Sequence, residues 1–459
     1  MADTRDEYGL RHRAIELHRQ GIARGVIRER LGRARSWVAK WLRRYREEGW
    51  AGLRSRSRAP QRQWQRTPDR VVARIVAIRE TLEQRRTRRS RFAGSGAEVV
   101  HLELQHQRVR PVPSLSTIER ILRRHGYPKR RPRRRKGGGE PYPAPRARLP
   151  GDLQQTDLVG PRHLRGPRGI TRFYSVHTVA IIGRGVATTQ GRHKTAELLC
   201  EHFVRAWRAL GPPRFSQMDN EMAATGGGRY PHSFSLVMRL HLLLGVHLLF
   251  IPPGAPGRNA HVESFNDLWQ ERVLQHPCPD LRALRRTNQA FLRYYHFGKP
   301  HRALRVDGDG TRYPGPWLAR HRAHLRTVPP SFSLAAYRNT HGRLRLPLAR
   351  GRVSFVRSVD PQGAIDINGK RYVLGRRLVG RYITATIFTH RRMLVVKVGA
   401  RRYKRFPFPQ HRHERNAASA SGKGTWLVPA AVHVGLDAMT IAGGDEGPVP
   451  SYRGSLVDA

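Results

Sequence analysis

Three carboxylates lie in or beside apolar segments of a sequence that otherwise has few acids. Asp157 lies in DLQQTDLVG, Asp219 ends RFSQMD, and Glu263 lies in NAHVESFND. If the first two segments are neighbouring strands, they run about 4.8 Å apart, and a later helix can aim Glu263 at the same point. Carboxylates so close repel one another unless a divalent cation lies between them, and oxygen-only ligands favour Mg²⁺. Two such ions about 3.5–4 Å apart support in-line displacement at a phosphodiester.

Other acids compete for these roles. Asp152 precedes Asp157 by an odd number of residues, so in one strand the two side chains point to opposite faces. Glu263 could instead be a first-turn acid that complements the helix dipole, and Asp267 lies one turn further on. Glu221 is either a spare carboxylate or a surface residue. The residues alone leave these alternatives open.

The charge balance indicates a polyanionic partner. The chain has 459 residues, with 87 Lys and Arg against 33 Asp and Glu, for a formal net charge of +54. Such an excess is self-repelling in a compact state, and binding to nucleic acid relieves it by releasing counterions from the phosphates. A coding sequence rich in G and C would explain Arg in place of Lys, but not the shortage of acids. Double-stranded DNA is therefore the expected partner.

Cysteine content and hydropathy exclude several classes. Cys200 and Cys278 are the two cysteines of the sequence, which excludes a disulfide scaffold and a Cys-rich zinc site. The stretch MADTRDEYGL has no apolar run, so we expect no secretory signal. The longest apolar stretch, SLVMRLHLLLGVHLLFIPP, is interrupted by Arg239, His241 and His247, so we expect no membrane span. A reducing, intracellular compartment follows as an expectation.

The first sixty residues predict three helices, in YGLRHRAIELHRQG, IARGVIRERLG and RARSWVAKWLRRYREEG, with Ser36 as the N-cap of the last. A short helix, a tight turn and a longer basic helix are typical of a helix-turn-helix domain, whose last helix enters the major groove. The alternative is a three-helix bundle with a solvated basic face. The residues expected to contact DNA lie on the last helix or just before it: Arg33, Arg35, Ser36, Trp37, Lys40 and Arg44.

Residues 68–127 predict a second helical unit that also resembles a helix-turn-helix, with Ser116 as the N-cap of its last helix. A structural spacer is the alternative. The polar residues that this helix would present to DNA are Ser114, Thr117, Arg120 and Arg123.

Seven of the nine residues from 128 to 136 are basic, and Gly and Pro follow them. We interpret this run, which includes Arg133, Arg134 and Arg135, as a linker that follows DNA phosphates. A nuclear-import signal is the alternative.

An α/β pattern begins at residue 151. Three β-rich segments are followed by helix, strand, helix, strand and helix, which predicts a mixed sheet covered by helices. Asn259 is the expected N-cap of the last of these helices. Residues 352–406 predict short strands, with the hairpin signal Asn-Gly at Asn368, and favour a small β-barrel.

The motifs QTDLVGP, QMDNE and FIPPGAPGRNAHVESFN resemble those of the integrase-core superfamily of Asp-Asp-Glu transposases and retroviral integrases. YYHFGKPHRAL resembles the segment that often follows that core, and GLRSRSRAP resembles the end of the helix-turn-helix in bacterial insertion-sequence transposases. The resemblance implies an RNase H-like fold, with Asp157, Asp219 and Glu263 as catalytic metal ligands. It also places Asn220 and Asn259 beside the site, with Asn259 as a DNA-binding residue.

The sequence departs from the pattern of the superfamily at two positions. Glu221 and Ala260 stand where many relatives have Gly. Neither departure removes a ligand. Ala260 could alter how the backbone approaches DNA.

We therefore expect a multidomain protein with α-helical helix-turn-helix units, a central α/β RNase H-like core and a C-terminal small β-barrel. The expected divisions are 1–60 (helix-turn-helix), 61–136 (second helical unit with a basic end), 137–150 (linker), 151–305 (core), 306–345 (connector), 346–408 (barrel) and 409–459 (flexible tail).

The expected function is that of a DNA transposase, which binds the terminal inverted repeats of a mobile element and catalyses strand nicking and strand transfer with Mg²⁺. Two ions are expected, and Mn²⁺ can substitute. A homo-oligomer on DNA, without a membrane, in a bacterial cytoplasm and associated with the nucleoid, is the expected setting. A separate ATPase partner stays an open question. The alternatives are a DNA-binding regulator with an inactive core and a metal-dependent nuclease that never joins strands.

Overall fold

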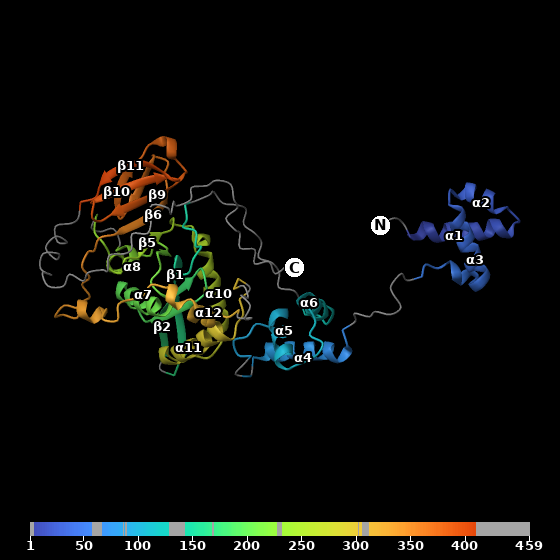
Figure 1. Ribbon diagram of the computed structural model, residues 1–459, viewed down its shortest axis with the longest axis horizontal. Helices are drawn as coiled ribbons and strands as arrows, with labels where there is room; N and C mark the ends of the chain where they lie inside the picture. The colour runs from blue at the N-terminus through green and yellow to red at the C-terminus, as the bar shows by residue number, and fades with distance from the viewer. Residues whose placement is uncertain are drawn as a thin grey trace. The chain divides into compact units, whose positions relative to one another are not determined.

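The computed structural model describes residues 4–56, 67–85, 87, 90–127, 143–167, 169–226, 232–301, 303–304 and 312–409 (Figure 1). It divides into two compact units, one formed by Met1–Arg74 with Val109–Pro113 and the other by Ile75–Arg108 with Ser114–Ala459. The predicted basic run at 128–136 lies outside the described residues, as does the predicted tail from residue 410 onward.

Three helices form the N-terminal domain, as predicted: α1 (Thr4–Arg19), α2 (Arg24–Leu31) and α3 (Arg35–Glu48), followed by the 3-10 turn η1 (Gly49–Leu53). They share a core that includes Ile15, Ile27 and Leu42. The expected cap of α3, Ser36, is wrong, because the helix begins two residues earlier than predicted. Ala34 is its N-cap and makes no side-chain cap hydrogen bond.

The second helical segment contains α4 (Asp69–Gln84), α5 (Ala97–His106) and α6 (Leu115–Arg124). Ser114, and not Ser116, caps α6, because the Ser114 hydroxyl accepts the backbone N–H of Thr117 at 3.3 Å. Side-chain caps of the same kind, which satisfy a free backbone donor, begin three later helices. They are Thr195, Ser235 and Asp280.

Nine strands of the described part form one sheet, in the order β11-β10-β9-β6-β5-β4-β1-β2-β3. The strands β1, β4, β5 and β6 at its centre are parallel, and the remaining pairs are antiparallel. A separate hairpin joins β7 and β8. The strand bounds are β1 Leu153–Gly166, β2 Gly169–Ala180, β3 Val186–Gly191, β4 Phe215–Met218, β5 His247–Phe250, β6 Arg352–Ser358, β7 Ala364–Ile367, β8 Lys370–Val373, β9 Tyr382–Phe388, β10 Met393–Val398 and β11 Arg401–Pro407.

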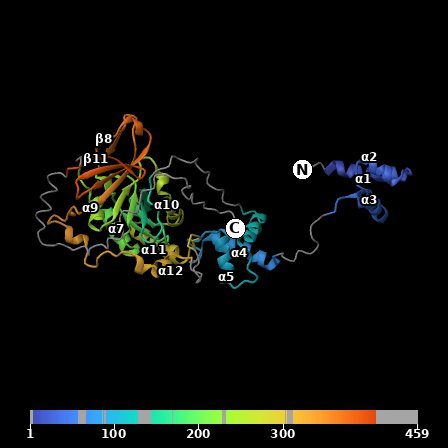
Figure 2. The same ribbon diagram turned by 45° about the horizontal axis from the view of Figure 1, so that its top comes forward.

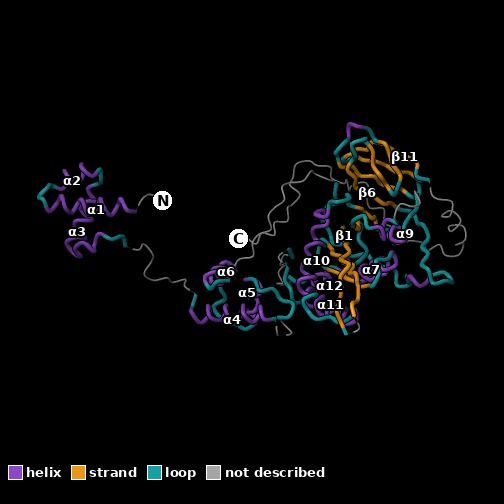
Figure 3. The backbone as a smooth tube through the Cα atoms, turned by 180° about the vertical axis from the view of Figure 1, so that it is seen from behind, coloured by secondary structure: helices purple, strands orange, loops and turns teal. Residues whose placement is uncertain are grey.

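Helices cover both faces of the part of the sheet around β1 and β2. Phe173 and Val179 of β2 pack with α10 (Ala260–Val273) and α11 (Leu281–Phe297). Val176, which points to the other face because strand side chains alternate, packs with α7 (Ala196–Leu210) and α9 (Leu236–Leu243). Figures 2 and 3 show α7 and α10 on opposite sides of the sheet.

Short elements complete the second unit. The sequence did not lead us to predict α11 or these short elements. They are α8 Met222–Thr225, η2 Pro256–Asn259, α12 Pro314–Arg320, η3 Arg322–His324, η4 Leu334–Tyr337 and η5 Arg376–Leu378. None of the helices in the described residues is long and apolar enough to cross a membrane.

The separate C-terminal barrel that the sequence favoured is not confirmed. The strand β6 pairs in parallel with β5, which extends the core sheet through β9 and β10 to the edge strand β11. The rings of Phe250 in β5 and Phe355 in β6 stack at 4.9 Å between centroids. The predicted short strands are present, but the hydrophobic cluster of the core continues into them. Local pattern identifies strands without identifying their partners.

A prediction follows from this shared core. Replacement of the fully buried Phe355 by Ala removes the stack on Phe250 and leaves a cavity, so it should lower the free energy of unfolding by about 3–5 kcal/mol. Denaturant unfolding should show one transition for the core and the C-terminal strands together. The matched control is Ile170→Ala, which removes an aliphatic side chain that is 69% exposed and should change stability little. An unchanged core transition in Phe355→Ala would contradict the prediction.

Candidate active site

Asp157 lies on β1, and Asp219 is the first residue after β4, the parallel neighbour of β1. In the register of β1 and β4, Thr156 lies opposite Met218, and each aspartate is the next residue of its chain. Parallel strands lie about 4.8 Å apart, so the two side chains start close together. The expectation that the two segments are neighbours is confirmed.

The two aspartates face the same side of the sheet. Gln155 and Gln217 each lie two residues before an aspartate, and both amide groups donate to the carbonyl oxygen of Arg258, at 3.4 and 2.8 Å. Because side chains alternate along a strand, Asp157 continues the face of Gln155, and Asp219 continues that of Gln217. That face is covered by η2 and the start of α10.

Gln155 also fixes the N-terminus of α10. Its Oε1 accepts the backbone N–H groups of His261 and Val262 at 3.0 and 3.4 Å, which satisfies donors that a helix leaves free. Asn259 is the N-cap residue of α10, as the sequence predicted, but its own side chain makes no cap hydrogen bond. A strand residue of β1 thus determines where α10 begins.

The side chain of Asn259 joins β1 to β4. Its amide nitrogen donates to the carbonyl of Thr156 at 3.0 Å, and its Oδ1 accepts from Gln217 at 3.3 Å. Asn259 is 2% exposed. A direct contact of this side chain with DNA would require it to leave both bonds.

Asn266 of α10 holds Asp157. Its amide nitrogen donates to Asp157 Oδ2 at 2.7 Å, and its Oδ1 lies 2.7 Å from His177 Nδ1. An amide oxygen can only accept, so His177 carries its proton on Nδ1, and its Nε2 accepts from the hydroxyl of Ser175 at 2.7 Å. Ser175 in turn accepts from Gln190 at 3.0 Å.

This chain of hydrogen bonds runs from β3 through β2 and α10 to the carboxylate on β1. Burial lowers the pKa of His177 to about 4, so the ring is neutral and its tautomer is fixed by its two partners. Sequence reasoning missed both His177 and Asn266. The available signal was the position of Asn266, one helical turn after Glu263 and on the same side of the helix.

The environment of the two aspartates disfavours a pair of negative charges. Burial raises the pKa of Asp157, although hydrogen bonds from the Leu158 backbone and Asn266 oppose this effect. Burial, then the charges of Asp157 and Glu221, raise the pKa of Asp219 to about 6. Lys194 pairs with Glu221 at 2.6 Å, so its charge is partly compensated there. The pair would be stabilised by additional positive charge.

Glu263 is not gathered with the aspartates in this structure. It is half-buried on α10, between the residues that contact Gln155 and the residue that contacts Asp157. Within the described ranges, no group of three or more His, Cys, Asp or Glu side chains could hold a metal ion. The structure therefore brings Asp157 and Asp219 together, while the assignment of Glu263 as a third ligand stays a prediction.

The competing acids have other environments. The backbone N–H groups of Arg148 and Leu149 donate to the Asp152 carboxylate, at 2.9 and 2.8 Å. Asp152 therefore fixes the conformation of the segment that precedes β1. Asp267 is exposed.

The residues predicted to contact DNA from the N-terminal domain differ in their surroundings. Arg35, Ser36 and Lys40 are exposed on α3. Arg33 pairs with Glu7, and its guanidinium lies 5.6 Å from the ring centre of Trp37.

Trp37 and Arg44 make contacts within the domain. Trp37 is half-buried against Trp41. Arg44 lies over the ring of Trp41 at 4.8 Å and donates to the carbonyl of Arg54 at 3.4 Å. These contacts stabilise the N-terminal domain, and the role of the two residues in DNA binding stays a prediction.

On α6, Arg120 and Arg123 are exposed. The hydroxyl of Thr117 hydrogen-bonds that of Ser114 at 3.0 Å. Arg133, Arg134 and Arg135 lie outside the described residues.

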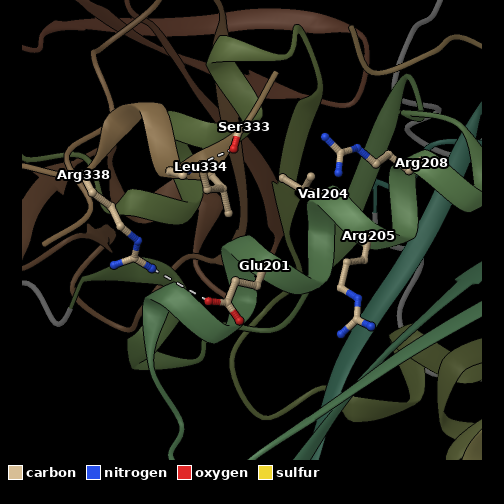
Figure 4. Close-up of a pocket in the computed structure, with 8 residues that line it drawn as sticks. Glu201, Val204, Arg205, Arg208, Ser333, Leu334 and Arg338 are labelled. Carbon is tan, nitrogen blue, oxygen red and sulfur yellow. Dashed lines mark hydrogen bonds and ion pairs between the residues drawn. The ribbon is translucent and has the colours of Figure 1, made fainter. Parts of the chain in front are cut away.

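A hollow of about 340 Å³ lies elsewhere, between α7 and η4 (Figure 4). Its lining includes Arg205, Arg208 and Leu334, and neither aspartate contributes to it. Arg338 crosses it to Glu201 at 3.9 Å, and Arg208 donates to the carbonyl of Phe332 at 2.6 Å. These contacts attach the connector to α7.

The raised pKa of Asp219 generates a test without DNA. The ionised carboxylate costs stability above pH 6 but not below its ordinary pKa near 4. Without divalent metal, Asp219→Asn should therefore raise the free energy of unfolding at pH 8 by about 1–3 kcal/mol, and this gain should vanish as the pH falls from about 6 to 4. Thermal unfolding across this pH range checks it, and destabilisation at pH 8 would contradict it.

Comparison with known proteins gives two family matches. Residues 8–54 match a homeodomain-like domain, and residues 244–306, which contain Glu263, match an integrase core domain.

Three solved structures also align, at low similarity. The HTLV-2 integrase catalytic core in complex with magnesium is 16% identical over 34% of this chain and 93% of that one, with a TM-score of 0.26. The simian T-cell lymphotropic virus intasome with the PP2A regulatory subunit B56γ is 15% identical over 69% and 93%, with a TM-score of 0.30. The BIV integrase core is 14% identical over 38% and 98%, with a TM-score of 0.27. The chain thus combines a homeodomain-like, helix-turn-helix domain with an integrase core domain, as its motifs led us to expect.

Proposed function

We propose that this protein is a DNA transposase that cuts and joins the ends of a mobile element. The observation that carries the proposal is the pair formed by Asp157 on β1 and Asp219 directly after the parallel strand β4, with Asp157 hydrogen-bonded to α10. Ligands in α/β sheets bind beyond the carboxyl ends of the parallel strands, and β4 ends one residue before Asp219. The integrase core match and the net charge of +54 agree with this function.

The donor set fits Mg²⁺, which binds through one or two carboxylates together with water and substrate phosphate. Asp157 and Asp219 would hold such ions, and Mn²⁺ can replace them. When bound, the ions would supply charge neutralisation and an activated nucleophile for in-line displacement at phosphorus. We propose Glu263 as the third ligand, because the helix that carries it begins on Gln155 and contacts Asp157 through Asn266.

The chain's own residues orient this site. Asn266 occupies one carboxylate oxygen of Asp157 and limits its rotation. Gln155 and Gln217 hold the turn at Arg258 against the strands, so α10 keeps its position relative to both aspartates. A geometry fixed in advance places the reacting groups without further reorganisation.

The same arrangement can serve both reactions of transposition. Nicking at the element's end uses water as the nucleophile and frees a 3′-hydroxyl, and strand transfer uses that hydroxyl on a target phosphodiester. In each step a P–O bond to the attacking oxygen forms as the P–O bond to the leaving 3′-oxygen breaks, so no covalent enzyme intermediate is needed. Two element ends must be joined, so we propose an oligomer assembled on DNA in a bacterial nucleoid.

The N-terminal domain would recognise the terminal repeats. Arg35, Ser36 and Lys40 are exposed on α3, the last of its three helices, which is the element that enters the major groove in helix-turn-helix domains. Arg120 and Arg123 on α6, together with the basic run that includes Arg133, would contact phosphates, which position DNA without specifying its sequence.

A DNA-binding regulator with an inactive core is the second candidate. The observation that favours it is that the described residues contain no cluster of three side chains able to hold a metal ion. It predicts binding to the element's ends that is sensitive to salt, with no cleavage in Mg²⁺ or Mn²⁺.

Substitution of the carboxylates separates these candidates. Asp219→Asn and Glu263→Gln should each lower the rate of end cleavage and strand transfer by at least about a hundredfold, because a metal ligand supplies several kcal/mol of transition-state stabilisation. Binding to a labelled element end should be retained. Asp267→Asn, one helical turn from Glu263 and exposed, is the matched control and should keep its activity. Full activity of Asp219→Asn would refute the transposase assignment.

A second test concerns recognition of the ends. Arg35→Ala should weaken binding to the terminal repeat and reduce the slope of log affinity against log salt by about one if the residue contacts a phosphate, or cost about 1–3 kcal/mol at one base pair if it contacts a base. Fluorescence anisotropy at several salt concentrations measures both quantities. Arg13→Ala on α1 removes the same charge from another helix and should have a smaller effect. Equal effects of the two variants would argue against α3 as the reading helix.

A further inference from the structure

The end of β6 reaches the segment that carries Asp219. Three hydrogen bonds join the C-terminal ends of the central strands at this point. The N–H of Ile251 donates to the carbonyl of Met218 at 3.0 Å, and the amide of Asn220 donates to the carbonyl of Ile251 at 2.5 Å. Arg357 Nη2 then donates to Asn220 Oδ1 at 2.8 Å. The row connects β4, β5 and β6 beside the carboxylate pair.

Arg357 is half-buried, and each of its three guanidinium nitrogens donates to the protein. Besides the bond to Asn220, its Nε donates to the carbonyl of Asp366 at 3.1 Å, and its Nη1 donates to the carbonyl of Val356 at 2.9 Å. The guanidinium also lies 5.0 Å from the ring centre of Phe355. Burial lowers its pKa to about 10, so it remains charged at neutral pH. Its three nitrogens are occupied by protein acceptors, which distinguishes it from the exposed cations that can reach DNA.

Asn220 is consequently fixed through both ends of its amide group. It is bonded directly to Asp219, whose Oδ1 accepts the N–H of Glu221 at 3.3 Å. Movement of Asn220 would therefore change the direction of the Asp219 side chain. A single guanidinium bridges this residue to two carbonyls of the C-terminal strands, and a planar fork of donors is suited to such a role.

We propose that Arg357 is a positioning residue of the carboxylate site, which acts through Asn220 to hold Asp219 in the direction needed to bind a divalent cation. The inference rests on the proposed function and deepens it. It assigns to the C-terminal strands, residues 352–407, a part in metal binding. Partners of this kind, one step removed from a metal, typically change metal affinity by 10- to 100-fold.

The test compares Arg357→Met with Arg405→Met in the full-length protein. Both variants lose one positive charge, but Arg405 is exposed on β11. Mn²⁺ binding without DNA, followed by electron paramagnetic resonance, should weaken by about tenfold or more in Arg357→Met and stay unchanged in Arg405→Met. In cleavage assays, kcat at fixed Mn²⁺ should fall in Arg357→Met while KM for DNA stays unchanged.

A double-mutant cycle tests the route through Asn220. If Arg357 acts through this residue, the loss of Mn²⁺ affinity in Asn220→Ala combined with Arg357→Met should be no larger than that of the more severe single variant. Full additivity of the two losses would overturn the proposal. If Arg357→Met does not fold, Arg357→Lys is the substitute, since it keeps the charge but cannot supply the same fork of donors, and the same loss of affinity is expected.

The outcomes separate this inference from the proposed function. Wild-type protein that binds Mn²⁺ and cleaves DNA, beside an Arg357→Met variant with unchanged Mn²⁺ affinity, overturns the inference alone. Wild-type protein that neither binds Mn²⁺ nor cleaves an element end overturns the proposed function and this inference with it.

Discussion

Two like charges held side by side, partly out of water, are the constraint on which the rest of the site depends. Asp157 and Asp219 have this relationship because β1 and β4 are parallel and in a register that aligns Thr156 with Met218. The amide side chains around them provide hydrogen bonds but little charge. A site of this kind is unfavourable when empty and anionic, and the same property gives it affinity for a hard cation.

Side-chain amides make the hydrogen bonds that connect the strands around the pair to η2 and α10. Gln155, Gln217, Asn259 and Asn266 each connect a strand to η2 or α10. An amide has both a donor and an acceptor and carries no charge, so it can be buried beside a carboxylate without neutralising it. Hydrogen bonds from amides can therefore orient these carboxylates without removing their charge.

The sequence predicted the strands β1 to β5 with the helices α7, α9 and α10 between and after them, the three N-terminal helices, and the pair formed by Asp157 and Asp219, because these depend on local periodicity and on motif residues. It did not predict that Ala34 and Ser114 are the N-caps of α3 and α6, since a shift of two positions changes the pattern little. It also did not predict that β6 joins β5, nor the contacts of Asn266 and Arg357. Such features depend on pairings between distant segments, which one sequence does not encode in any short window.

The two edges of the sheet have different consequences for how copies of the protein meet. The edge strand β3 contacts α7 and α11, whereas on β11 Arg401, Arg402, Lys404 and Arg405 are exposed. A row of like charges along an open edge opposes pairing with the same edge of another copy. Continuous sheets that span two molecules through β11 are therefore disfavoured, and this repulsion guards a highly cationic chain against aggregation until a polyanion neutralises it.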